Sequence, residues 1–255
     1  MRRLPTVFLS ATLMLCGGAA HAFAQTRLPL PPNPEPRVRA MINGGYQPST
    51  TTFDDSFTFS LYQETGTTEA SYSVDAGAIF EGGAAVRLWK GLALGGVISH
   101  FTVDAAATVT SSVPHPFFLQ RNRDVSGEPD GLRREETAIH LQAQYQLPPA
   151  GKLHVVLAGG PTIIDVKQTI VIDVNYTEEF PYDTAPFTGV DSKRGTGTAM
   201  GFNAGVDFQW MFNPNLGAGA LVRFSKATVD MNVDNRIIQV EAGGTQIAAG
   251  LRLAF

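Results

Sequence analysis

The sequence predicts an all-β fold: an eight-stranded antiparallel up-and-down transmembrane β-barrel whose strands extend on the extracellular side. Three observations predict it. Apolar and polar side chains alternate along segments of roughly ten residues, the length that a tilted strand needs to cross a bilayer. Short and long connections alternate between these segments. Aromatic residues collect where the segments meet the short connections.

The N-terminus has the three parts of a secretory signal peptide. Arg2 and Arg3 supply the basic region, residues 7–16 are mostly apolar, and "AFA" at 22–24 offers small residues before a cleavage site. We therefore expect residues 1–24 to be a signal peptide that is removed on export.

The exported chain would contain no cysteine, because the single cysteine of the sequence, Cys16, leaves with the signal peptide. Its stability would then not depend on a disulfide. Leu15 stands where a lipoprotein signal would have a small residue, so no lipid anchor is expected. Removal of Arg2 and Arg3 changes the formal net charge from −4 to −6. That balance argues against a nucleic-acid partner, since nucleic-acid binding needs a basic face.

Residues 25–36, "QTRLPLPPNPEP", hold five prolines and are expected to form an extended periplasmic lead. The barrel is expected to occupy residues 37–255. Its connections are short at 90–91, 147–152 and 213–215, long at 48–75, 114–131 and 176–197, and tight at Asp234-Asn235. In outer-membrane barrels the short turns are periplasmic and the long loops are extracellular.

The clearest alternation occurs in segments 77–89, 137–147, 200–212 and 245–255. In 200–212, one set of alternate positions is apolar and ends in Phe208, Trp210 and Phe212. The other set includes Asn203, Asp207 and Gln209. Successive side chains of a strand point to opposite faces, so each segment has one apolar and one polar face.

Strands in the opposite direction are expected at 38–47, 92–101, 153–162 and 216–225. Their alternation is less regular, and Val97 and Ile98 leave the phase of 92–101 open. Pro161 has no N–H to donate, which predicts a bulge or a break. Alternation continues past the bilayer length, with a turn near residues 65–67, so we expect the wall to extend above the outer leaflet.

The apolar faces are expected to contact lipid and the polar faces to fill the barrel. Glycines and charged residues share the polar faces, which suits the narrow lumen of a small barrel. The expected lumen network is Arg39, Glu81, Arg87, Glu136, His140, Asp207, Arg223 and Arg252. Arg87 and Arg252 are expected to pair with Glu81, Glu136 or Asp207. A filled interior predicts a closed barrel rather than a diffusion pore. A periplasmic β-sandwich is the alternative fold.

Aromatic residues near the short turns are expected to form an interfacial girdle: Trp89, Tyr145, Trp210, Phe212 and Phe255. Together with the signal peptide, the proline-rich lead and the terminal "QIAAGLRLAF", the strands resemble the OmpA/OmpX-type small outer-membrane β-barrels of Gram-negative bacteria. The resemblance covers about residues 38–255. It implies a place in the bacterial outer membrane, contact with lipid and lipopolysaccharide, and recognition of Phe255 by the outer-membrane insertion machinery. It implies a location more than an activity.

No catalytic residue, metal site or cofactor is expected. Ser99 and His100 are adjacent in a strand, so they point to opposite faces and could act together only with a partner from another strand. His140 is expected to join the lumen network, and His115 lies between two prolines in a spacing that is poor for metal binding. The alternative functions are an enzyme that acts on lipid A or peptides at the outer rim, and a small porin.

The long loops supply Phe117, Phe118, Tyr176 and Tyr182, which are expected to recognise a possible extracellular ligand. The alternative is that these loops pack on one another and cap the barrel. The predicted function is therefore a structural or surface-interaction role, such as adhesion at the cell surface, without enzymatic activity.

Overall fold

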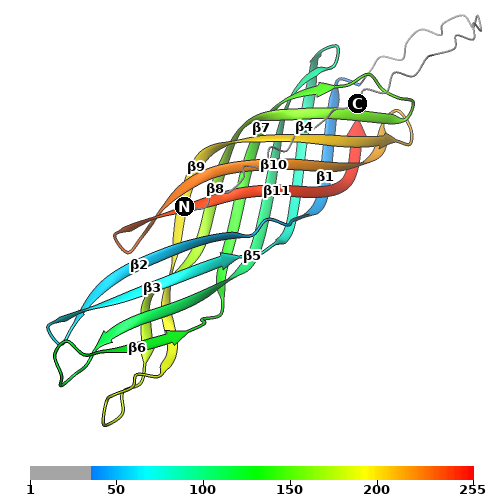
Figure 1. Ribbon diagram of the computed structural model, residues 1–255. Helices are drawn as coiled ribbons and strands as arrows, with labels where there is room; N and C mark the ends of the chain where they lie inside the picture. The colour runs from blue at the N-terminus through cyan, green and yellow to red at the C-terminus, as the bar shows by residue number, and fades with distance from the viewer. Residues whose placement is uncertain (1–35) are drawn as a thin grey trace, which may run out of the picture. The chain divides into compact units, whose positions relative to one another are not determined.

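The structure is a computed structural model that describes residues 36–255 (Figure 1). These residues form one unit, Pro36–Phe255. The expected signal peptide, residues 1–24, lies outside the described residues, as does the proline-rich lead apart from Pro36. No helix in the described part of the chain is long and apolar enough to cross a membrane.

Eleven antiparallel strands form one sheet within residues 36–255 (Figure 1). They are β1 (Val38–Gln47), β2 (Thr51–Leu61), β3 (Glu64–Val74), β4 (Gly77–Trp89), β5 (Leu92–Pro114), β6 (Asn122–Gly127), β7 (Leu132–Gln146), β8 (Leu153–Tyr176), β9 (Phe187–Met211), β10 (Leu216–Val233) and β11 (Arg236–Ala254). The all-β class expected from the alternation is confirmed.

Most of the strands close into a ring. β1 pairs with β4 on one side and with β11 on the other. The pairs β4–β5, β5–β7, β7–β8, β8–β9, β9–β10 and β10–β11 complete the ring. Since every member pairs on both sides, the ring leaves no open edge along its closed part.

The remaining strands lie outside this ring. β3 pairs with β2 and with residues 106–112 of β5. β6 pairs with residues 109–114 on the opposite side of β5. The described residues therefore contain eleven strands where the sequence predicted eight. The extra strands arise because the connections 48–75 and 114–131 alternate in their own right and form a hairpin and a short strand.

Strand bounds agree best near the short turns. β1 and β4 have the predicted limits, 38–47 and 77–89, whereas β5 and β8 continue by more than ten residues past the predicted 101 and 162. The β2–β3 turn is at Tyr62-Gln63, with φ of 54° and 66°, and not near residues 65–67. The β10–β11 turn is at Asp234-Asn235 as expected, with φ of 48° and 64°.

Pro161 breaks one ladder without shifting it. On the β7 side, no partners are paired between His140↔Thr162 and Ala143↔Gly159, and the register is the same before and after the gap. On the β9 side, Pro161 remains paired with Phe202. The expected irregularity is therefore a local gap, because proline removes one donor while the flanking residues keep the strand in place.

The barrel has two parts that differ in the chemistry of their faces. The turn half comprises β1, β4 and residues 92–103, 137–146, 153–163, 200–211, 216–225 and 244–254. The loop half comprises β2, β3, β6 and the remaining residues of the strands, which lie farther from the short turns. In the turn half, outward residues such as Phe80, Phe202 and Ile247 are exposed, and inward residues such as Asn203 and Arg223 are buried.

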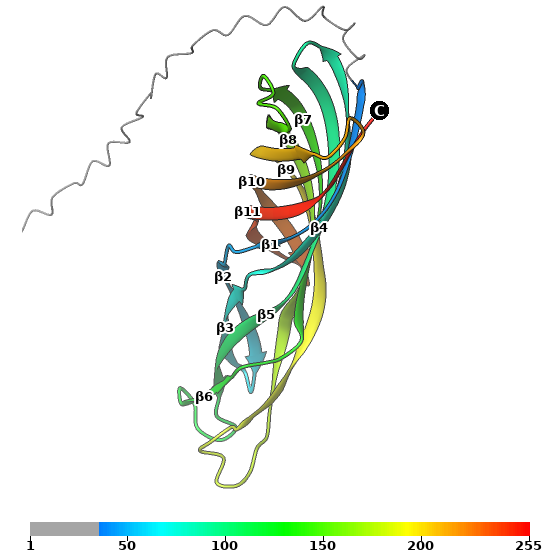
Figure 2. The same ribbon diagram turned by 90° about the vertical axis from the view of Figure 1, so that its right-hand side faces the viewer.

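In the loop half the polarity of the two faces is reversed: polar side chains point outward and apolar side chains point inward. Thr108 and Asp230 face outward and are exposed, whereas Val109 and Val229 face inward with no exposed surface. One hydrophobic cluster joins inward side chains of β2, β3 and β5 to those of β8, β10 and β11. Figure 2 shows β2, β3 and β6 on the left of this part, with the long yellow strands on the right. The loop half is thus built like a water-soluble sandwich with its own apolar core.

Candidate functional site

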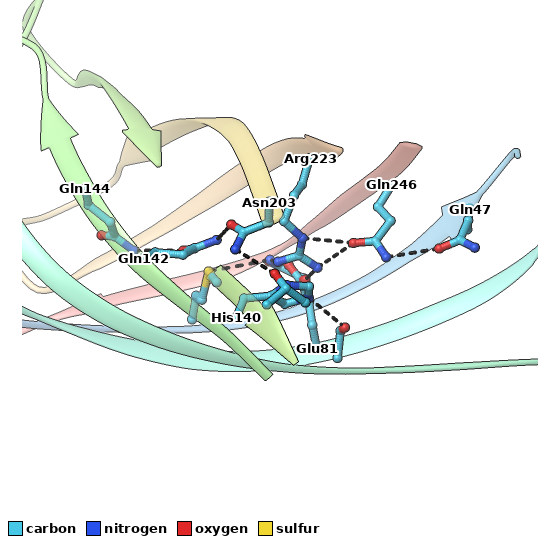
Figure 3. Close-up of polar contacts among 12 residues, drawn as sticks. Gln47, Glu81, His140, Gln142, Gln144, Asn203, Arg223 and Gln246 are labelled. Atoms are coloured by element: carbon cyan, nitrogen blue, oxygen red, sulfur yellow. Dashed lines mark hydrogen bonds and ion pairs between the residues drawn. The ribbon is translucent and has the colours of Figure 1, made fainter. Parts of the chain in front are cut away.

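A buried ion pair lies at the centre of the turn half. Arg223 of β10 donates from Nη2 to Glu81 of β4, and both side chains are at most 1% exposed (Figure 3). Nε and Nη2 of Arg223 also donate to Oε1 of Gln246, at 2.9 and 2.6 Å. The second carboxylate oxygen of Glu81 accepts from Nδ2 of Asn43 at 2.6 Å. The pair crosses the barrel interior, since β10 and β4 are not neighbours in the ring.

A second buried ion pair lies nearer the short turns. Arg252 donates to both carboxylate oxygens of Asp207, at 2.9 and 2.7 Å, and also to Oδ1 of Asn43. Gln209 donates to the same carboxylate at 2.7 Å. The guanidinium needs the space above Gly219, where an added Cβ would lie 2.7 Å from Nε of Arg252. Two parallel hydrogen bonds fix this pair in one geometry.

An uncharged chain of hydrogen bonds continues from β5 to β9. The hydroxyl of Ser99 lies 3.0 Å from Nε2 of His140, and Nδ1 of His140 lies 2.8 Å from the hydroxyl of Thr162. Asn203 donates to that hydroxyl at 2.8 Å and accepts from Gln142 at 2.9 Å (Figure 3). Both ring nitrogens of His140 therefore face hydroxyl groups, and not the carboxylate that a serine–histidine catalytic pair would use.

The network is bounded on the loop side by a third ion pair. Nε of Arg134 donates to Glu136 at 2.7 Å, and Nη2 donates to the backbone oxygen of Glu241 at 2.6 Å. Glu136 accepts in turn from the backbone N–H of Gly243 at 2.9 Å. Arg134 is 1% exposed. Beyond this pair, the buried side chains of the hydrophobic cluster begin, so the interior changes from polar to apolar.

The structure brings most of the expected lumen residues together, and one expected pairing forms among them. Arg252 pairs with Asp207, one of the three acids proposed for it. Glu81 pairs with Arg223, and Glu136 pairs with Arg134, which the sequence did not single out. Arg39 and Arg87 are half-buried nearer the short turns. Among the described residues, no group of three His, Cys, Asp or Glu side chains could hold a metal ion.

The expected girdle residues all lie on the outside near the short turns. Their exposed fractions are 65% for Trp89, 47% for Tyr145, 52% for Trp210, 55% for Phe212 and 63% for Phe255. Farther from the short turns, the outward row of β9 continues with Phe208 and Phe202. Large aromatic side chains that point away from the protein at one level are typical of a membrane–water boundary.

The loop tips carry a second group of exposed aromatic residues. We call the exposed Phe117, Phe118 and Phe180, together with the half-buried Tyr182 and the buried His115, the tip cluster. The ring of Phe117 lies 5.4 Å from that of Tyr182, and the rings of Phe180 and Tyr182 are 6.1 Å apart. Phe117 and Phe118 are 71% and 54% exposed, and Phe180 is 86% exposed. Two connections, β5–β6 and β8–β9, therefore meet through their aromatic side chains.

His115 fixes the first of these connections from within. It is 2% exposed, and its Nδ1 accepts the backbone N–H groups of Phe117 and Phe118 at 3.1 and 3.3 Å. The role that the sequence left open for His115 is thus to fold the loop. Tyr176 differs from its predicted group. It is half-buried beside Arg123, packs on the apolar core, and burial raises the pKa of its phenol.

Polar contacts tie three loop tips together. Arg121 pairs with Asp183 at 2.8 Å, and Arg123, whose side chain is 2% exposed, pairs with Glu178 at 2.5 Å. The hydroxyl of Tyr62 in the β2–β3 turn donates to Glu178 at 3.2 Å. The backbone N–H of Gln120 donates to Glu64 of β3 at 2.6 Å. The tip cluster is therefore held on a cross-linked base rather than on independent loops.

The residues considered for an outer-rim enzyme do not meet. His100 faces outward, with Nδ1 3.2 Å from the hydroxyl of Thr137, while Ser99 faces inward to His140. The separation of Ser99 and His100 follows from the alternation of the strand. The sequence could not show that Ser99 would reach a histidine of β7 inside the barrel, since that contact depends on register.

No protein-family model matches the chain, and no curated protein matches its sequence. Solved structures with a similar arrangement include neisserial surface protein A, 11% identical, with 86% of this chain and 97% of that chain covered and a TM-score of 0.43. The outer membrane protease OmpT from Escherichia coli is 9% identical, with 86% and 97% covered and a TM-score of 0.48. Ail, the attachment invasion locus protein of Yersinia pestis, solved with the heparin analogue sucrose octasulfate, is 11% identical, with 85% and 99% covered and a TM-score of 0.36. The likeness is one of fold alone.

Proposed function

We propose that this chain is an outer-membrane β-barrel with a closed interior, in which the ring of β1, β4, β5 and β7 to β11 forms the eight-stranded wall. The chain presents a rigid extracellular surface for contact with a partner. The turn half spans the bilayer, and the loop half stands outside the cell. The exposed apolar row of β9 supports this placement, because the same side chains would be costly to expose to water around a whole ring. Closure of the ring satisfies the backbone groups that lipid cannot.

The interior is filled by its own ion pairs rather than open to solutes. Arg223, Glu81, Arg252 and Asp207 are all buried, and each is held by at least two polar partners. Charges in a narrow lumen are tolerated when they are paired and hydrogen-bonded in this way. A small porin would instead show steady conductance in planar bilayers, and we expect this chain to show none.

The outward contacts follow from the same placement. Lipid and lipopolysaccharide surround the exposed row, and the terminal Phe255, 63% exposed at the end of the last strand, is the feature for the insertion machinery to recognise. A Phe255→Ser variant is expected to reach the outer membrane in lower yield than the wild type, which outer-membrane fractionation measures.

The observation that carries the surface-interaction role is the tip cluster. Monomeric proteins normally bury side chains as large as Phe180 and Phe117, yet here they are 86% and 71% exposed. Their supporting loops are fixed by His115 and by the Arg121–Asp183 and Arg123–Glu178 pairs. Fixed aromatic side chains lose little entropy on contact, so they suit adhesion to an apolar patch of a partner or surface.

The test compares cells that produce the wild type with cells that produce the triple variant Phe117→Ser, Phe118→Ser, Phe180→Ser. Ile237→Ser is the matched control, because Ile237 is 75% exposed at the separate β10–β11 turn. Retention of the cells on an octyl-coated surface and on epithelial cells is measured at equal surface amounts of protein. We expect the triple variant to lose retention and the control to keep it. Equal retention of all three would contradict a binding role for the tip cluster.

A further inference from the structure

β2 is an edge strand with no partner on its far side. Within residues 36–255, Thr51–Leu61 pairs only with β3, in an unbroken register from Thr51↔Val74 to Leu61↔Glu64. In an antiparallel strand, alternate residues direct their N–H and C=O groups away from the paired neighbour. About half of the backbone groups of β2 are therefore open to a further strand.

Beyond Asp55, whose carboxylate points inward to Arg236, this edge lacks the features that usually prevent strand addition. Natural edge strands carry lysine or proline, are very short, or are bent by a bulge. β2 has eleven residues, no lysine, no proline and no bulge against β3. Its outward residues above Asp54 are the small polar Ser56, Thr58 and Ser60.

Arg236 already contacts the part of this edge around Asp55. Arg236 of β11 lies 3.3 Å from Asp55 in an ion pair and 4.2 Å above the centre of the Phe57 ring. Its Nη2 also donates to the backbone oxygen of Val171 at 3.3 Å. The free part of β2 is therefore the part beyond Arg236, at residues 56–61.

A cleft of about 580 Å³ adjoins this free part. It is lined on one side by Phe57 and Phe59 of β2 and on the other by Ile172 and Asp173 of β8, with Asp234 and Arg236 at the end. Phe57, Phe59 and Ile172 give it an apolar floor. Asp173 and Asp234 give it an acidic rim. Two cations lie beside that rim: Arg236, which also lines the cleft and is paired with Asp55 at 3.3 Å, and Lys193, 3.8 Å from Asp234. An aliphatic side chain with a cationic end fits both features.

We propose that residues 56–61 of β2 bind an extended peptide segment of a partner protein by strand addition, with a lysine or arginine side chain of that segment in the acidic cleft. Backbone hydrogen bonds to the open edge supply affinity, and the cleft supplies specificity, as in other cases of β-strand addition. The site is separate from the tip cluster, so the two surfaces can be tested independently.

The test uses the full chain refolded in detergent micelles and two fluorescein-labelled peptides, Thr-Val-Thr-Lys-Thr-Val-Thr and the same peptide with Glu in place of Lys. Fluorescence anisotropy gives the two Kd values. We expect the Lys peptide to bind more tightly than the Glu peptide. Asp173→Asn and Asp234→Asn are each expected to weaken Lys-peptide binding about twofold to fivefold, the range for partly exposed charge pairs. Asp130→Asn, in the exposed β6–β7 connection, is the matched control and is expected to leave Kd unchanged.

Hydrogen exchange of the backbone amides distinguishes strand addition from loose charge attraction. Saturating Lys peptide is expected to slow exchange at residues 56–61 and to leave the amides at 117–120 unchanged. Absence of binding by both peptides, equal Kd values for the Lys and Glu peptides, equal effects of Asp173→Asn and Asp130→Asn, or protection at the loop tips instead of β2 would each overturn the proposal. None of these results bears on the closed interior or on the retention of cells by the tip cluster.

Discussion

Removal of the Arg223 guanidinium tests how dry the barrel interior is. In Arg223→Met, Glu81 would keep only the hydrogen bond from Asn43, and Oε1 of Gln246 would lose two donors. Because both charged side chains are at most 1% exposed, the remaining carboxylate could not be solvated without rearrangement. Loss of one partner of such a pair typically costs about 3–5 kcal/mol.

The double variant Glu81→Leu, Arg223→Met separates the charge effect from the packing effect. Replacing both members with apolar residues of similar size is often neutral or stabilising. We expect the double variant to recover most of the stability lost in Arg223→Met. Urea unfolding of the refolded chain in micelles, followed by the fluorescence of Trp89 and Trp210, gives the free energies.

The measurement can refute the reasoning plainly. If the free energy of unfolding of Arg223→Met lies within about 1 kcal/mol of the wild-type value, Glu81 has access to water. The interior would then be hydrated rather than filled. Such a result would also favour measurable ion conductance, and thus the small-porin alternative.

Three further outcomes follow from single contacts. Gly219→Val is expected to cost about 1–3 kcal/mol in urea unfolding, because an added Cβ would lie 2.7 Å from Nε of Arg252 and displace it from Asp207; an unchanged midpoint would contradict this packing. Tyr72→Phe is expected to cost about 1–3 kcal/mol, because the buried Val171 N–H, which donates to the Tyr72 hydroxyl at 2.9 Å, loses its acceptor; faster amide exchange at Val171 is the specific readout. Burial raises the pKa of Asp55 above its unfolded value, so folding favours its protonated form and its contribution to stability falls as pH rises from about 4 through the folded pKa. The free energy of unfolding of Asp55→Asn should therefore increase relative to that of the wild type as the pH rises over this range. A difference between the two free energies that does not change with pH would contradict this.

The sequence predicts the turn half well because its environment is uniform. A strand of the turn half has exposed apolar side chains on one face and a crowded polar interior on the other, so a period of two in the sequence reports the orientation directly. For that reason Phe202, Asn203 and Asp207 lie on the faces expected of them. The strand limits of β1 and β4 follow from the same alternation and the adjacent short turns.

The loop half was less predictable because the meaning of the alternation reverses there. Phe53 and Tyr72 stack inside with ring centres 4.6 Å apart, whereas Phe202 of the turn half points outward. The sequence therefore classes 48–75 among the long polar connections. Its alternation indicates a continuing wall with a turn near residues 65–67, but not the separate strands β2 and β3. Arg134 was missed for a different reason. In residues 133–136, "RREE", charged residues occupy both faces, so alternation does not show which of them point inward.

Pairing inside the barrel depends on geometry that composition does not contain. Arg223 meets Glu81 across the lumen, from a strand that is not its neighbour, and this contact depends on the stagger of the whole ring. The sequence could therefore identify which residues would face inward, but not which of them would form pairs. The tip cluster is similar, because Phe117 and Tyr182 come from connections that are distant in sequence.

Quenching of tryptophan fluorescence by brominated lipids most directly tests the placement of the turn half in a bilayer. The chain has two tryptophans, Trp89 and Trp210, and both point outward near the short turns, 65% and 52% exposed. In liposomes, bromines placed near the headgroups should quench both strongly, and more than bromines at the bilayer centre. Emission that neither lipid quenches would mean that these side chains lie in water or in a protein interface, and that the barrel does not face lipid.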